Sequence, residues 1–130
     1  MRRVILLFGT VMILLVGASC SKFRKIEKSL DWRVKYEAGL NYYSKNEYYK
    51  ASALFEQILP IVRGLPEGEK VQFYQAYCQY YQKLYLLSAE QFKTFYETYG
   101  RSTMVEEARF MNAYSLYKSS PGANLDQSKS

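Results

Sequence analysis

The stretch that decides the fold runs from Tyr36 to Phe55 and reads YEAGLNYYSKNEYYKASALF. On both sides of its polar centre, residues 45–47, small and aromatic residues recur at helical spacing, which predicts two helices joined by a tight turn. After a shift of 37 residues the same classes of side chain return, and after a second shift they return again. The matching positions are Tyr36, Phe73 and Phe110; Gly39, Ala76 and Ala113; and Tyr43, Tyr80 and Tyr117. A fixed period of about 20 to 50 residues is typical of stacked repeats, so we expect an all-α stack of helix-turn-helix units.

Small residues are expected where the two helices of a unit approach most closely. They are Gly39 on the first helix and Ala51 on the second, and Phe55 is expected to fill the space beside them. This pattern resembles the tetratricopeptide family, whose units of about 34 residues carry small residues at the contact positions and an aromatic residue four after the second. The resemblance implies about two and a half units with the 37-residue period. We place the three additional residues of each unit in the glycine- and proline-rich connection 63–68.

The expected organisation divides the chain into six segments. They are a lipoprotein signal peptide (1–19), a lipidated tether (20–29), repeat 1 (30–66), repeat 2 (67–102), the first helix of repeat 3 (103–118) and a polar tail (119–130). Pro60 predicts a kink or an early end of the second helix, because proline has no amide hydrogen. The third and fourth helices are expected over 69–83 and 85–99, and Thr103 with Glu106 predicts a capping box before the last helix.

Residues 1–19 have the features of a cleaved signal peptide. Arg2 and Arg3 precede a mostly apolar run of thirteen residues, which is short for a bilayer-spanning helix of about 20 residues. Small residues then lead to Cys20, and this site resembles the lipobox of bacterial lipoproteins. The resemblance implies lipid attachment at Cys20, with stable anchoring by more than one acyl chain. By analogy with lipoprotein sorting rules, Ser21 after the cysteine favours the outer membrane at its periplasmic face.

The charge of the chain is modest. The net charge of +6 becomes +4 when residues 1–19 are removed, because Arg2 and Arg3 leave with them. Four basic residues gather in the tether, which we expect to be flexible and solvated: Lys22, Arg24, Lys25 and Lys28. Attraction of this group to anionic lipid is the alternative reading. Nucleic acid is not an expected partner, because no dense basic face follows elsewhere.

The sequence does not predict an enzyme. It has no histidine, which is the commonest general base and metal ligand. With Cys20 committed to lipid, Cys78 cannot form a zinc site of the usual cysteine and histidine spacing. No phosphate-binding glycine loop or nucleophile elbow is present, so no cofactor and no metal are expected. Cys78 itself is expected to be a buried small hydrophobe, with a redox or disulfide role as the alternative.

Tyrosine is abundant in this chain, which has fourteen tyrosines, all of them after residue 35. Tyrosines that recur at the repeat period are expected first to pack the core and the contacts between helices. A second reading is that some of them offer amphipathic rings to an extended peptide, since aromatic residues dominate recognition surfaces. The candidate peptide-binding residues are Tyr42, Tyr43, Tyr80 and Tyr81.

Several segments together resemble the BamD family, the lipoprotein subunits of the outer-membrane β-barrel assembly machinery. The resemblance covers the lipobox, the tether, the 37-residue units, YLLSAEQFKTFYETYG at 85–100, EEARFMNAY at 106–114, and Ser120-Pro121 with Leu125-Asp126-Gln127. It implies a non-catalytic scaffold whose partners are unfolded outer-membrane proteins and the barrel-assembly subunit. Family members carry five repeats, so the resemblance implies that this chain corresponds to their amino-terminal portion.

Two alternatives stay open at the level of sequence. One is a different periplasmic tetratricopeptide adaptor that serves a cell-wall or division complex. The other is a truncated form without independent function, suggested by the half-unit after residue 103 and by the aromatic residues on its helix.

Overall fold

The computed structural model describes Met1 and residues 21–121. The predictions that concern the signal peptide, Cys20 and the polar tail after residue 121 lie outside the described residues. Within residues 21–121 every regular element is a helix, which confirms the all-α class. Residues 21–27 are helical, and five further helices follow: α2 (Trp32–Ser44), α3 (Tyr48–Val62), α4 (Pro66–Tyr81), α5 (Tyr85–Thr98) and α6 (Val105–Ser119).

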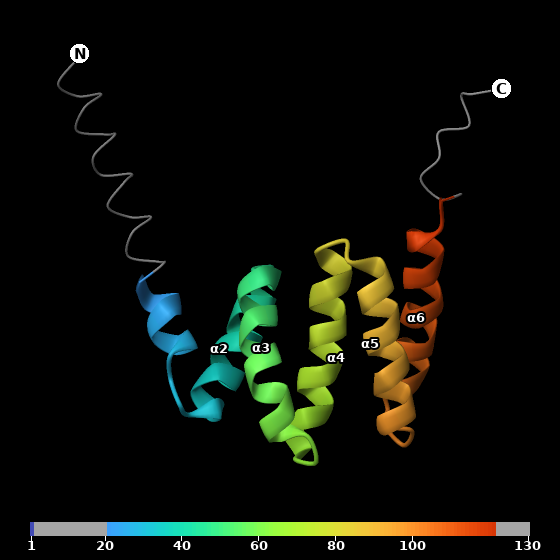
Figure 1. The fold of residues 1–130 in the computed structure, drawn as a ribbon, viewed down its shortest axis with the longest axis horizontal. Helices are drawn as coiled ribbons and strands as arrows, with labels where there is room; N and C mark the ends of the chain where they lie inside the picture. Colours follow the sequence, from blue (N-terminus) through green and yellow to red (C-terminus); the bar gives the residue numbers. More distant parts are fainter. Residues whose placement is uncertain (2–20, 122–130) are drawn as a thin grey trace.

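The helices form a staggered row, in which α2 lies partly behind α3 and α6 partly behind α5 in this view, and successive helices run in opposite directions (Figure 1). Each packs chiefly against its neighbours in sequence, α2 on α3, α3 on α4, α4 on α5 and α5 on α6. Within the described residues, none of the helices is both long and apolar enough to cross a bilayer.

The turns after α2 and after α4 have the same backbone geometry. Asn46 and Lys83, which are 37 residues apart, both adopt the left-handed conformation, with φ of 61° and 64°. The next amide reaches back five residues in both turns: Glu47 N–H donates to the Tyr42 carbonyl and Leu84 N–H donates to the Gln79 carbonyl, each at 2.9 Å. This is the Schellman arrangement, which satisfies carbonyls at a helix end and reverses the chain.

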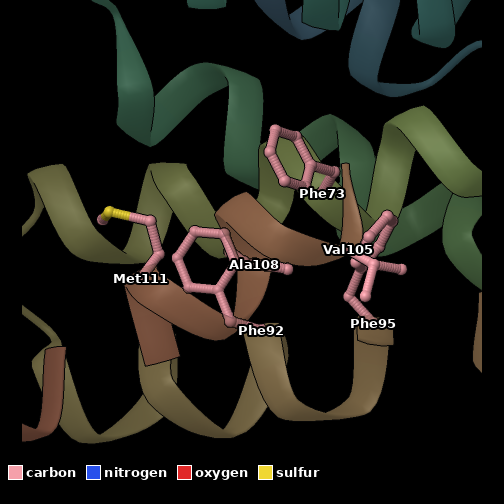
Figure 2. Close-up of a cluster of buried hydrophobic side chains, with 7 residues drawn as sticks. Phe73, Phe92, Phe95, Val105, Ala108 and Met111 are labelled. Atoms are coloured by element: carbon pink, nitrogen blue, oxygen red, sulfur yellow. The ribbon is translucent and has the colours of Figure 1, made fainter. Parts of the chain in front are cut away.

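Two apolar clusters form the core. One joins α3 and α4 through buried Ala51, Phe55, Ile58, Val62, Val71 and Cys78, with aromatic residues of α2 packed against it. The other joins α4, α5 and α6 through Phe73, Ala76, Phe92, Phe95, Val105, Ala108 and Met111 (Figure 2). Cys78 is free and fully buried, as the sequence predicts.

Small residues allow close packing of the helices, as expected at Gly39. A Cβ atom on Gly39 would lie 2.5 Å from Cε1 of Phe55, so the ring fills the space that the missing side chain leaves. Gly68 shows a tighter approach that the sequence analysis missed. A Cβ atom there would lie 2.3 Å from the backbone oxygen of Val62, where α4 begins beside the end of α3.

Three local expectations were wrong. Of the kink or early end expected at Pro60, the early end is wrong, because helix α3 continues to Val62. Pro60 is exposed, so its ring and the carbonyl that loses a partner can face water. Helix α4 begins at Pro66 rather than residue 69, because proline has the backbone angle that suits the first helical position.

The third wrong expectation is the capping box. Helix α6 begins at Val105 after Met104, with no side-chain cap on its first turn from Thr103. Instead, the Ser102 hydroxyl accepts a hydrogen bond from the Met104 amide at 3.0 Å. The side chain that serves this helix start therefore lies one residue earlier than expected.

The predicted tether also differs, because residues 21–27 form a helix rather than an irregular segment. The Phe23 ring meets the Tyr42 ring edge-on at 5.6 Å. Part of the segment is thus held against α2 by an aromatic contact.

Candidate functional site: a strip of tyrosines on alternate helices

Three of the four candidate tyrosines belong to one connected set of rings. We call this set the tyrosine strip, and its members are Tyr43, Tyr48, Tyr74, Tyr77, Tyr80, Tyr81, Tyr85, Tyr114 and Tyr117. Most of them come from α2, α4 and α6, which alternate in the row, and Tyr48 and Tyr85 come from the starts of α3 and α5. Tyr42 lies apart, between Phe23 and the ammonium group of Lys50.

The first part of the strip joins α2 and α3 to α4. The ring of Tyr43 lies 4.7 Å from that of Tyr74, measured between centroids. Tyr48 stacks on Tyr81 at 4.3 Å with an interplanar angle of 17°. These contacts place the last residue of α4 over the first residue of α3, so the strip crosses from the first pair of helices to the second.

The second part of the strip joins α4 to α6. Tyr80 lies 6.0 Å from Tyr114, and Tyr114 stacks on Tyr117 at 6.2 Å. The hydroxyl of Tyr77 donates a hydrogen bond to Oε1 of Glu107 at the start of α6. The strip is therefore continuous from α2 to the end of α6.

Equivalent ring pairs bracket the two Schellman turns. Tyr43 and Tyr48 meet at 5.6 Å, and Tyr80 and Tyr85 meet at 5.4 Å. Both pairs are edge-on, and each ring of the second pair lies 37 residues after its equivalent in the first pair. The same contact between two aromatic rings therefore joins the end of α2 to α3 and the end of α4 to α5.

Burial favours the neutral form of three phenols of the strip, those of Tyr43, Tyr77 and Tyr80. Burial, followed by the neighbouring phenol of Tyr81, raises the pKa of Tyr43 far above its ordinary value. Burial also raises the pKa of Tyr77, and its hydrogen bond to Glu107 adds to the effect. For Tyr80, burial and then interaction with Tyr114 raise the pKa to about 12. These three side chains consequently offer hydroxyl groups and ring faces without charge at neutral pH.

Access to the strip is uneven. Tyr81 and Tyr117 are exposed to 46% and 62%, whereas the other members are half-buried. The exposed rings can stack on apolar or aromatic side chains, and phenol hydroxyls can hydrogen-bond to peptide groups. Such a surface suits an uncharged extended chain better than an anion.

Sequence reasoning found Tyr43, Tyr80 and Tyr81 as candidate binding residues but missed the other members of the strip: Tyr48, Tyr74, Tyr77, Tyr85, Tyr114 and Tyr117. A signal for two of these was present, because Tyr74, Tyr77 and Tyr81 follow the three- and four-residue spacing of one helix face. No comparable signal marks Tyr48, whose place opposite Tyr81 depends on how α3 packs against α4.

A buried polar cluster between α3 and α4 was also missed. The side-chain amides of Gln75 and Gln79 both donate to Oε1 of Glu56, at 3.0 and 3.3 Å, and to the hydroxyl of Ser52, at 3.0 and 3.2 Å. Beside it, burial and then the Glu56 carboxylate raise the pKa of the Cys78 thiol to about 12. A thiol held in its neutral form is a poor nucleophile. We therefore interpret the polar cluster and Cys78 as part of the packing between α3 and α4.

Residues 21–121 contain no group of three or more acidic, cysteine or histidine side chains arranged to hold a metal ion. The tyrosine strip is thus the strongest candidate site on the described surface.

No protein-family model matches this chain, and no curated protein matches it. The resemblance to the BamD family therefore stays a prediction of the sequence.

Proposed function

We propose that this chain is a non-catalytic, lipid-anchored scaffold of outer-membrane β-barrel assembly, which holds extended segments of unfolded barrel proteins on the tyrosine strip. In this proposal Cys20 carries the lipid, the protein faces the periplasm, and the barrel-assembly subunit is the second partner. The observation that carries the proposal is the continuity of partly exposed, neutral tyrosine rings across α2, α4 and α6.

The proposal includes tetratricopeptide-like repeats with a 37-residue period. Supporting it are the matching turns at Asn46 and Lys83 and the matching ring pairs beside them. The contact of Phe55 with Gly39 also supports it, as does the hydrogen bond from the Ser88 hydroxyl to the Ala76 carbonyl at 3.0 Å. Gly39 and Ala76 are equivalent in the period, and each meets the following helix closely.

Binding by the strip can be tested with fluorescently labelled peptides that copy strands of outer-membrane barrels. Tyr81→Ala and Tyr117→Ala remove the two most exposed rings, so together they should weaken binding by about tenfold or more, as loss of central aromatic anchors does. Tyr49→Ala is the matched control, because Tyr49 is 75% exposed but lies outside the strip. Unchanged affinity in the double variant, with helicity retained, would count decisively against the strip.

The cellular role has a separate test. Depletion of the protein should lower the amounts of integral barrel proteins in the outer membrane while their transcripts persist. Crosslinking from position 81 should then capture unfolded barrel proteins. If cell-wall or division proteins were captured instead, and barrel levels did not change, the chain would be an adaptor of another complex.

A further inference from the structure

One end of the helix row gathers exposed apolar side chains and lysines. Figure 1 shows the turn between α4 and α5, the start of α3 and the end of α6 at the upper end of the row. The helix over residues 21–27 also begins at this end of the row. We call this surface the turn edge, and it comprises residues 21–22, 45–50, 82–87 and 118–119.

Large apolar side chains stand out into solvent along the turn edge. Leu86 is 69% exposed, and Leu84 and Leu87 are exposed to 48% and 45%. The three leucines line a hollow of about 530 Å³ together with Lys83 and Lys118. Tyr49 of α3 lines a second hollow with Leu84 and Leu87, whose remaining lining is mostly polar, so the leucines of α5 adjoin an exposed ring of α3 there. Contiguous exposed apolar surface of this kind marks an interaction site.

The charges on the turn edge are mostly positive. Lys22 and Lys45 line one hollow, together with Glu37 and Glu47. Glu47 forms an ion pair with Lys50, while Lys83 and Lys118 flank the leucines. The opposite end of the row differs, because the first turns of α4 and α6 place acidic residues there, Glu67, Glu69, Glu106 and Glu107. Arg63, Lys70 and Arg101 are mixed among them.

We infer that the turn edge docks on a bilayer that contains anionic phospholipid, with Leu84, Leu86, Leu87 and Tyr49 entering the headgroup region and the lysines contacting lipid phosphates. Apolar side chains ringed by lysine are the combination that binds such an interface. The edge also contains Ser21, which follows the proposed lipid-bearing Cys20, so an anchored chain would bring this edge to the membrane. Tyr48 and Tyr85 belong to both surfaces, and Tyr81 and Tyr117 directly precede turn-edge segments in sequence, so the tyrosine strip would then run alongside the bilayer.

Only the orientation of the turn edge towards the membrane rests on the proposed lipid attachment. A chain without lipid therefore tests whether the turn edge itself binds a bilayer. Both core clusters lie within residues 21–121, so residues 20–130 with Cys20→Ser retain every described contact of the helix row. This chain should sediment with phosphatidylglycerol vesicles and not with phosphatidylcholine vesicles. Each lysine near an anionic surface contributes about fivefold to binding, so Lys45→Gln with Lys83→Gln should weaken it by about 25-fold.

Matched controls come from the opposite end. Lys70→Gln with Arg101→Gln removes the same amount of charge and should change binding by less than about twofold, because the Debye length is about 10 Å. Leu86→Ser should weaken binding several-fold, and Leu65→Ser, at an apolar residue 41% exposed on the other end, should not. Circular dichroism of each variant checks that the helices are retained.

Orientation can be read directly from tryptophan fluorescence. In a Trp32→Phe background, Leu86→Trp should shift to shorter wavelength on addition of phosphatidylglycerol vesicles, and Leu65→Trp should not shift. Absence of vesicle binding, or equal shifts at both positions, would overturn the inference. If the turn edge does not bind vesicles, its occupant would be a protein partner instead. This result would not affect the proposed scaffold function.

Discussion

At the scale of the residue, Lys83 carries avoidable backbone strain. Its φ of 64° lies in the left-handed region, where an L-residue with a Cβ is disfavoured by about 1–2 kcal/mol and glycine is not. Lys83→Gly should therefore raise the free energy of unfolding by about 0.5–1 kcal/mol, which urea denaturation can measure. Asn46→Ala, at the equivalent turn, should lower it, because asparagine tolerates this conformation better than alanine. A loss of stability in Lys83→Gly would contradict this account of the turn.

Gly39 gives the opposite expectation at the same scale. Alanine is the better helix former by about 1 kcal/mol, but its Cβ would lie 2.5 Å from the fully buried ring of Phe55. Because the ring has no room to withdraw, Gly39→Ala should lower stability by about 1–3 kcal/mol. Gly100→Ala is the control, since its Cβ would meet only the Tyr96 carbonyl at 3.6 Å. Partial rescue by Phe55→Leu would identify the clash as the cause, and a stabilised Gly39→Ala would refute it.

At the scale of the element, the polar cluster fixes how α3 faces α4. Glu56→Ala would deprive the buried amides of Gln75 and Gln79 of their carboxylate acceptor, leaving only the Ser52 hydroxyl. The expected loss in thermal or urea stability is about 1–3 kcal/mol. Glu56→Gln keeps an acceptor oxygen and should lose less, and Glu90→Ala, at an exposed position of α5, is the control. Equal stability of the two Glu56 variants would show that the cluster contributes little.

At the scale of the whole molecule, the tyrosines and Cys78 make the fold sensitive to alkali. Burial raises the pKa of Cys78 from its ordinary 9.0 to about 12 and that of Tyr80 to about 12. The folded state favours the protonated forms, so their contribution to stability is complete below about pH 9 and is lost as pH rises towards 12. Melting temperature should fall across this window, and tyrosinate absorbance should appear together with unfolding.

Two controls accompany the alkaline prediction. Tyr80→Phe should make the melting temperature less dependent on pH, and Tyr49→Phe, at an exposed position, should not. Cys78 should react slowly with thiol reagents at pH 8 until denaturant is added. Rapid labelling of the folded protein would contradict the burial of this thiol.

Much of the fold could be predicted from the sequence because its signals are local. The 37-residue recurrence, the polar residues at 45–47 and the small residue at 39 identified the first two helices and placed the turn between them where the structure has it. The errors arose where local rules compete. Pro60 loses only one hydrogen bond on an exposed face, so packing of α3 outweighs it, and Ser102 rather than Thr103 meets the amide of Met104.

The sequence by itself determined the helical class, the positions of the turns and the supply of tyrosine, since backbone propensity and side-chain periodicity act over a few residues. Only the tertiary structure decided which rings meet, because that depends on how each helix is rotated against the next. Distant residues meet where Tyr48 stacks on Tyr81, where the glutamine pair contacts Glu56, and where Lys118 lines one hollow with the leucines at 84–87. Contacts of this kind follow from packing across helices, which no local pattern records.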